Sequence, residues 1–261
     1  MALERVRRLL WLGRRRVQEP IRSHFDVGPR VRRLFREARK TPEYQRPYEK
    51  RDPLVSVCVA TYNRAELLVS RSLPSLLSQT YPNLQIIVVG DGCTDDTAER
   101  VASLSDRRIL FVNLPKRGDY PDDPHLRWMV AGTAALNHAL SLAKGDFITH
   151  LDDDDEHSAD RIETLIRIIQ DARADLVFHP FEVETVSGQW QLNRANAFDL
   201  GQVTTSSVLY HRWFRRLGWD PLAYRYGEPG DWNRFRKFSY LGLRVARHER
   251  RLLKHYRERN Q

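Results

Sequence analysis

The sequence of 261 residues predicts an α/β protein with an open, mostly parallel sheet flanked by helices. Strand-like and helix-like segments alternate from residue 53 to residue 180, which is typical of a parallel sheet with helices on both faces. The strand-like runs are nearly continuous in apolar and β-branched residues, as strands buried on both faces require. One of these runs ends in five consecutive acids, at the place where such sheets bind ligands.

The elements follow one another at regular spacing. Strands are expected at 54–60, 84–89, 109–112, 147–151 and 175–179, with helices over 65–77, 97–101, 131–143 and 159–171 between them. Pro74 should kink the first of these helices, because proline has no N–H to donate. After residue 180 the pattern changes to a hairpin around Ser187-Gly188, a strand at 203–210, a short helix at 211–217, and a loop at 227–233 that enters a further helix.

The net charge of +9 is unevenly distributed along the chain. Residues 1–40 carry 13 Lys/Arg against 4 Asp/Glu and residues 244–261 carry 7 against 2, so the centre is mildly acidic. Because the centre is acidic and the basic ends lack the interleaved aromatics of single-strand binders, nucleic acid is an unlikely partner. Residues 1–52 are expected to be a basic extension and linker with one helix at 29–39, and residues 244–261 a basic C-terminal helix.

Residues 1–17 alternate Arg with Leu, Val and Trp. This pattern fits a basic amphipathic helix on an anionic membrane surface, a helix packed on its own domain, or a disordered arm, and we weigh the three equally. The sequence has no run of 18 apolar residues and no secretory signal. Its two cysteines, Cys58 and Cys93, fit a reducing compartment. We therefore expect a cytoplasmic protein that could lie peripherally at the inner face of the membrane.

The acidic run, Asp152-Asp153-Asp154-Asp155-Glu156, is the feature around which the chain is organised. Adjacent carboxylates repel one another, so they need either water or a counter-charge. A solvated acidic loop is the simpler interpretation. A strand leads directly into the acids and a helix follows, and this position favours a site where Mg²⁺ or Mn²⁺ holds phosphate oxygens.

Several segments in this order resemble family 2 glycosyltransferases with the GT-A fold. The segments are Val55 to Arg64, Ser78 to Asn83, Ile86 to Thr97, Asn137 to Asp146, Leu151 to Asp155 with Asp160-Arg161, and Gly227 to Trp232. Each motif is weak alone, but their order and spacing are specific, and they cover about residues 53–240. The resemblance implies a GT-A domain over 53–243, with a nucleotide-binding half at 53–156 and an acceptor half at 157–243.

The resemblance also implies an activity and assigns residues to it. The expected reaction is inverting, metal-dependent transfer of a sugar from a nucleotide diphosphate, UDP being the first choice, to a hydroxyl on a glycan, lipid or similar acceptor. Ala60, Tyr62, Arg64 and Asp91 would hold the nucleotide, Asp152 and Asp153 the donor, and Asp154, with help from Asp152, the Mn²⁺ or Mg²⁺ ion. Asp155 would orient these ligands or touch the sugar. Asp91 could instead be an ordinary turn residue.

The general base is expected on the acceptor side, where inversion requires it. The resemblance assigns this role to Asp231, with Glu228 as a substitute, although Asp231 could simply cap a helix. The sequence departs from the family pattern at Gly90 and Gly230, each of which stands where an acid is usual. These departures are the reason to keep an alternative function, a nucleotide-sugar-binding or scaffolding protein that has lost catalysis.

Overall fold

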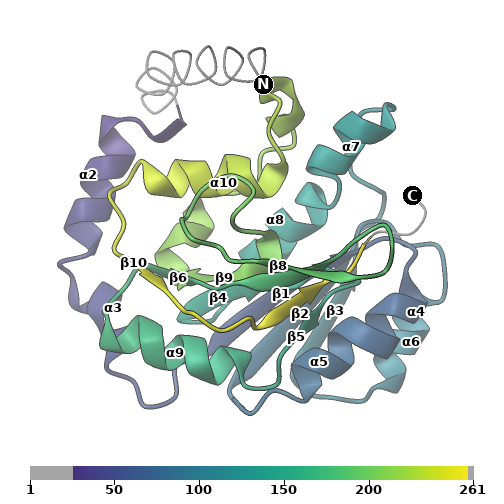
Figure 1. The fold of residues 1–261 in the computed structure, drawn as a ribbon, viewed down its shortest axis with the longest axis horizontal. Coiled ribbons are helices and arrows are strands. Elements are labelled where there is room, and N and C mark those ends of the chain that lie inside the picture. The colour runs from purple at the N-terminus through teal and green to yellow at the C-terminus, as the bar shows by residue number, and fades with distance from the viewer. Residues whose placement is uncertain (1–25, 258–261) are drawn as a thin grey trace.

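The computed structural model describes residues 26–257 and shows a mixed α/β fold built on a seven-stranded sheet (Figure 1). The strands lie in the order β10 (Val245–Arg247), β6 (Leu176–Phe178), β9 (Val208–His211), β4 (Phe147–His150), β1 (Val55–Thr61), β2 (Leu84–Gly90) and β3 (Ile109–Asn113). Only β9 runs antiparallel to its neighbours, so the predicted mostly parallel sheet is confirmed.

Helices cover both faces of this sheet (Figure 1). On one side lie α7 (Pro124–Val130), α8 (Thr133–Leu142) and α10 (Gly230–Ser239); on the other lie α4 (Ala65–Leu67), α5 (Leu73–Leu77), α6 (Thr97–Ser103) and α9 (Arg161–Asp171). The central strands β1 and β4 are buried along nearly their whole length. Their aliphatic side chains therefore pack against helices on both faces, which is what their continuous apolar sequence requires.

Besides η1 (Arg46–Tyr48) in the N-terminal extension, four short 3-10 or π segments lie in the described domain: η2 (Leu68–Ser72), η3 (Thr205–Ser207), η4 (Arg212–Arg216) and η5 (Ala223–Tyr226). The first is the predicted irregularity at Pro74. Proline has no N–H for the carbonyl one turn earlier, and the chain forms a π-helical turn between α4 and α5.

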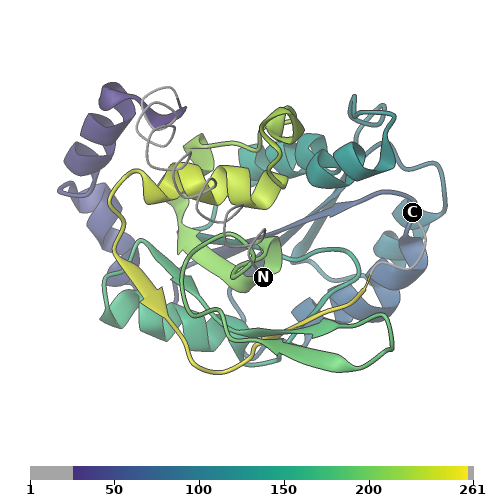
Figure 2. The ribbon, with the colours of Figure 1, turned by 45° about the horizontal axis from the view of Figure 1, so that its top comes forward.

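A second, four-stranded sheet has the order β5 (Glu156–His157), β11 (Leu253–His255), β7 (Phe181–Glu184) and β8 (Trp190–Asn193). Figure 2 shows the C-terminal segment beside the β7–β8 hairpin, as the pairing of β11 with β7 requires. The expected hairpin at Ser187-Gly188 is confirmed, but the expected C-terminal helix is wrong. Leu252 and Leu253 are buried whereas Lys254 is exposed, and the backbone of this segment pairs with two strands.

The described part of the N-terminal extension is not a linker. The predicted helix is present as α2 (Pro29–Ala38) and is followed by α3 (Pro42–Gln45) and η1 (Arg46–Tyr48). Phe35, Tyr44 and Tyr48 are buried in the main core. Asp175 on the domain accepts hydrogen bonds from Tyr44 Oη at 2.7 Å and from the Arg244 amide at 2.7 Å, so it joins both ends of the described chain.

The membrane-surface helix expected at residues 1–17 lies outside the described residues. Among residues 26–257, no helix combines the length and the apolar character that crossing a bilayer demands.

Candidate functional site

The carboxyl ends of β1, β2 and β4 open into a cavity of about 840 Å³. Parallel neighbours end at the same edge of the sheet, so segments far apart in sequence meet there. Of the residues expected at the site, the following line this cavity: Ala60, Tyr62, Arg64, Asp91, Asp152, Asp153, Asp154 and Asp231. Asp155 lies just behind the wall and is fully buried.

The acidic loop is held by its backbone. Ser72 Oγ donates to the carbonyls of Asp152 (3.1 Å) and Asp155 (3.0 Å), and Arg71 Nη1 donates to the carbonyl of Asp154 (2.8 Å). Both donors lie on the π-helical turn η2, so the irregular turn before Pro74 is what presents them to the loop. The loop is therefore not a solvated acidic turn: Asp153, Asp154 and Asp155 are all buried.

Arg64 supplies a counter-charge to the middle of the acidic loop. Its Nη1 lies 3.1 Å from Asp153 Oδ1 and 2.9 Å from Asp154 Oδ2. Burial raises the pKa of Asp153 to about 6, although Arg64 acts in the opposite direction. Arg64 thus neutralises acids at the floor of the cavity, and the ion pair takes up an oxygen of Asp154, the residue that we expected to be the main metal ligand.

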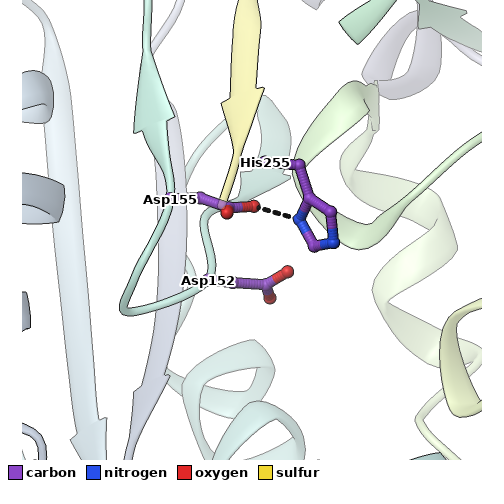
Figure 3. Close-up of side chains that lie close together, drawn as sticks. All are labelled: Asp152, Asp155 and His255. Atoms are coloured by element: carbon purple, nitrogen blue, oxygen red, sulfur yellow. Dashed lines mark hydrogen bonds and ion pairs between the residues drawn. The ribbon is translucent and has the colours of Figure 1, made fainter. Parts of the chain in front are cut away.

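A different trio of side chains converges as a metal site would require. Asp152, Asp155 and His255 each offer one ligand atom, and these atoms lie within 4.8 Å of one another. Figure 3 shows both carboxylates and the imidazole turned toward the same space. His255 Nδ1 lies 2.9 Å from Asp155 Oδ2, and the Tyr256 amide donates to Asp155 Oδ1 at 3.0 Å. The structure thus favours Asp155 over Asp154 as a partner of Asp152.

His255 was not expected from the sequence. It reaches the site because β11 pairs with β5, the two-residue strand that directly follows the four aspartates. Burial alone would lower its pKa, but the charges of Asp155, Asp152 and Asp154 outweigh this and raise it to about 9. This direction favours the imidazolium form of His255, paired with the Asp155 carboxylate. In the sequence, apolar Leu253 followed by basic Lys254 is too short an alternation to predict a strand.

The donor set fits a divalent cation. Two carboxylates and one imidazole nitrogen are ligand types found around Mn²⁺, whereas Mg²⁺ prefers oxygen and would be held by the carboxylates. Burial and the neighbouring Asp155 charge raise the pKa of Asp152 well above its usual range. Burial likewise raises the pKa of Asp155, although His255 opposes it. A cation bound here would relieve that repulsion, and its binding would release the His255 proton.

Asp231 stands across the same cavity at the first turn of α10. Its Oδ1 accepts from the Trp232 amide at 2.6 Å, and burial raises the pKa of its carboxyl. Its charge also acts on the pKa of Asp152, so the two acids face the same space. A carboxylate with a raised pKa, held at a cavity wall, is suited to accepting a proton.

Glu228 is not placed to substitute for Asp231. Its Oε2 lies 2.9 Å from Arg236 Nη2 and 3.0 Å from Asn233 Nδ2, and it is absent from the cavity lining. Arg236 also contacts Asp26 at 2.6 Å. Glu228 therefore anchors α10 to the start of the described chain through Arg236, and its position favours Asp231 over Glu228 as the candidate base.

The far end of the cavity holds Asp91, which is buried. Its two oxygens accept from the Gly118 amide at 3.0 Å and from Tyr120 Oη at 2.7 Å. These bonds fix the carboxylate at the wall and leave its remaining lone pairs for a ligand. Nearby, the Arg117 guanidinium lies 3.8 Å from the centre of the Tyr62 ring, so a cation and an aromatic face meet at this end.

The two departures from the family pattern have packing reasons. A Cβ at Gly90 would lie 2.4 Å from Asn113 Oδ1, because the Asn113 side chain fills that space and bonds both backbone groups of Cys93. A Cβ at Gly230 would lie 3.1 Å from the Met129 carbonyl oxygen on α7. Neither glycine displaces the neighbouring acid, since Asp91 and Asp231 both line the cavity.

Comparison with known proteins agrees with this architecture. A family model described as "Glycosyl transferase family 2" matches residues 56–121 and 125–242. Glycosyltransferase GlyG of Streptococcus pneumoniae serotype 4 (strain ATCC BAA-334 / TIGR4) is 34% identical over 126 residues, covering 48% of this chain and 38% of that protein. The Escherichia coli UDP-Glc:alpha-D-GlcNAc-diphosphoundecaprenol beta-1,3-glucosyltransferase WfgD is 33% identical over 133 residues, covering 51% and 47%. The chain spans less than half the length of either curated relative.

Solved structures show the same fold at lower identity. TarS 1-349 of S. aureus in complex with UDP-GlcNAc aligns with a TM-score of 0.62 and 18% identity, covering 80% of this chain and 60% of that one. The mannosyltransferase PcManGT from Pyrobaculum calidifontis in complex with GDP-Man and Mn²⁺ aligns with a TM-score of 0.56 and 19% identity, covering 90% and 66%. The seven-stranded sheet is thus the sheet of GT-A glycosyltransferases.

Proposed function

Because the chain belongs to glycosyl transferase family 2, we propose that it is an inverting, metal-dependent glycosyltransferase that uses a UDP-sugar. The observation that carries this proposal is the meeting, in one cavity, of a buried acid cluster and a separate carboxylate with a raised pKa. One side offers the chemistry for a metal and a diphosphate, and the other offers a base. A binding protein without catalysis has no need for the second group.

The nucleotide would lie along the ends of β1 and β2. Ala60 leaves space at the wall, Tyr62 and Arg117 offer faces for a flat base, and Asp91 offers carboxylate oxygens to a base N–H or a ribose hydroxyl. Two similar proteins are associated with uridine nucleotides: TarS was solved with UDP-GlcNAc and WfgD is named for UDP-Glc. A third, PcManGT, was solved with GDP-Man. UDP is therefore our first choice.

The acid cluster would hold the cation. Asp152, Asp155 and His255 would be its protein ligands, with Asp153, Asp154 and Arg64 forming the charged floor beside them. When bound, Mn²⁺ or Mg²⁺ supplies a Lewis acid that neutralises the diphosphate as it leaves. Arg71 keeps the loop in place through the Asp154 carbonyl and stacks over the Tyr256 ring at 3.6 Å.

Asp231 would act on the acceptor. Its carboxylate takes the proton of an acceptor hydroxyl while that oxygen attacks the anomeric carbon, and the bond from this carbon to the diphosphate oxygen breaks on the opposite face. Inversion follows from attack opposite the leaving group. The raised pKa brings Asp231 closer to neutrality, where a general base is most effective.

The acceptor would be a glycan or a lipid-linked sugar. WfgD is named for an acceptor in which GlcNAc is joined to diphosphoundecaprenol, and this supports a saccharide whose far end lies in a membrane. An enzyme acting on such an acceptor would work at the membrane surface, so we propose a peripheral location at its cytoplasmic face. Salt-sensitive binding to anionic liposomes tests this point.

Calorimetric titration of UDP in the presence and absence of Mn²⁺ tests the donor site. We expect metal-dependent UDP binding that Asp152→Asn abolishes and that Asp122→Asn, an exposed loop acid outside the cavity, leaves unchanged. UDP at a hundred times its Kd should also stabilise the protein by about 2.7 kcal/mol. Metal-independent binding, or equal affinity for UDP and GDP, would contradict the assignment. Binding without transfer to any acceptor in a broad panel would instead favour a non-catalytic binding protein.

A further inference from the structure

The helix α7 touches the start of α10, the helix that carries the proposed base. The point of contact is Gly230, where an added Cβ would be 3.1 Å from the Met129 carbonyl oxygen, 3.5 Å from Thr133 Cγ2 and 3.7 Å from the Trp219 ring. Met129 is the neighbour of Trp128 on α7, and Gly230 is the neighbour of Asp231 on α10. The glycine therefore brings the backbones of two functional elements together at the cavity wall.

Trp128, which precedes Met129 on α7, is an exposed aromatic residue of the cavity wall. Its side chain is 50% exposed and lines the cavity, whereas Trp219 and Trp232, which line the same cavity, are 5% and 6% exposed. A tryptophan of the wall that keeps half its surface in water has apolar area left to cover.

We propose that Trp128 is the stacking platform for a pyranose ring of the acceptor, a subsite on the acceptor side of the cavity. This inference rests on the proposed function, because it assumes that Asp231 is the base. A pyranose presents a face of C–H groups that packs on an indole, while its hydroxyls point outward from the ring edge. A ring lying on Trp128 therefore directs hydroxyls along the wall toward Asp231, and the acceptor class is a saccharide rather than a simple alcohol or a protein side chain.

Gly230, which stands where the family usually has an acid, then has a function in acceptor recognition. A side chain at that position would crowd the Met129 backbone carbonyl, which would have to move by a few tenths of an ångström. Glycine at 230 avoids this crowding and lets α7, which carries Trp128, pack against the start of α10. The missing acid is then a feature of acceptor recognition rather than a sign of lost catalysis.

Saturation-transfer NMR on the full chain with Mg²⁺ and UDP tests the subsite directly. The probes are methyl α-glycosides of N-acetylglucosamine, glucose, galactose and mannose. We expect at least one pyranoside to receive saturation on the C–H protons of one ring face. Trp128→Ala should weaken its binding about fivefold to tenfold, the size expected for losing one aromatic partner, and Trp128→Phe should restore part of it.

Two controls separate the outcomes. Trp190→Ala removes a tryptophan of similar exposure, 40%, outside the cavity lining and should leave pyranoside binding unchanged. UDP affinity, measured by calorimetry, should be the same in all variants. Failure of every pyranoside to bind the wild type, equal binding by Trp128→Ala, or equal losses of UDP and pyranoside binding would each overturn the subsite. Absence of UDP binding in the wild type would instead overturn the proposed function.

Discussion

Replacing Asp231 by Asn gives the sharpest test of the proposed chemistry. Asparagine has nearly the same shape, and its carbonyl oxygen can still accept from the Trp232 amide, the 2.6 Å bond that orients the side chain. It cannot take a proton. A general base typically contributes 10²- to 10⁴-fold to the rate, so kcat should fall by about this factor, which corresponds to an activation free energy higher by about 2.7–5.5 kcal/mol. UDP affinity should not change.

The pH dependence supplies a second readout of the same variant. Burial raises the pKa of Asp231, and the base is active only when deprotonated. In the wild type, kcat/KM should therefore be at its maximum above this raised pKa and should fall as the pH drops through it. In Asp231→Asn this acid limb should disappear from the residual activity. The variant should unfold at the same temperature or a higher one, because it removes a buried charge.

The assay is initial-rate transfer with the donor and acceptor found in the screens above, over a series of buffers of constant ionic strength. Asp122→Asn serves as the matched control, since it removes an exposed carboxylate that does not line the cavity. Retention of activity within tenfold of the wild type would refute the role of Asp231. So would an unchanged acid limb in the variant.

Four further perturbations have defined outcomes. His255→Gln should weaken Mn²⁺-dependent UDP binding at least about tenfold in calorimetry, and unchanged metal dependence would remove it from the ligand set. Gly90→Ala should cost about 1–3 kcal/mol in urea unfolding, because its Cβ would meet Asn113 Oδ1 at 2.4 Å; Asn113→Gly should recover part of this loss, and no recovery would show that the side-chain clash is not the cause. Glu228→Gln should destabilise by about 3–5 kcal/mol through the buried Arg236, and a specific loss of kcat with normal stability would contradict its structural role. Burial lowers the pKa of His211 to about 3, so between about pH 6.5 and pH 3 only the unfolded state takes up this proton, and the free energy of unfolding falls as the pH falls. His211→Asn should make this fall less steep by up to about 1.4 kcal/mol per pH unit; an unchanged slope would exclude this contribution.

The central part of the fold could be predicted because its signals are local. The β-branched runs at 54–60, 84–89 and 147–151 can satisfy their apolar side chains only inside a sheet, and the glycines and polar residues after them mark its edge. The same pattern brought Asp91 and Asp152 to the cavity. The order of the motifs also predicted that Asp231 lies at the start of a helix, where it lines the cavity, although no periodicity distinguishes a base from a cap.

What could not be predicted depends on pairing between distant segments. Residues 253–255 are too few and too basic to show a strand pattern, and they become β11 only because β5 and β7 offer open edges. The position of His255 follows from that pairing. The burial of Phe35 was likewise hidden by the many arginines of α2, whose apolar side packs on the domain.

The four aspartates show a third limit of prediction from local sequence. Four consecutive aspartates look alike in sequence, and their functions differ only through what each side chain meets. Arg64 meets Asp153 and Asp154, and His255 meets Asp155. Local sequence shows that the run needs positive charge, but it does not show which acid receives which cation.

The placement of His255 on β11 has a consequence for how the protein is made. The acids emerge from the ribosome about a hundred residues before the imidazole that accompanies them. Until that strand arrives, the nascent chain must carry Asp152 and Asp155 either protonated or in contact with water. The donor pocket is therefore among the final features to mature, and a released chain truncated before Leu253 should form the large sheet while remaining unable to retain a nucleotide.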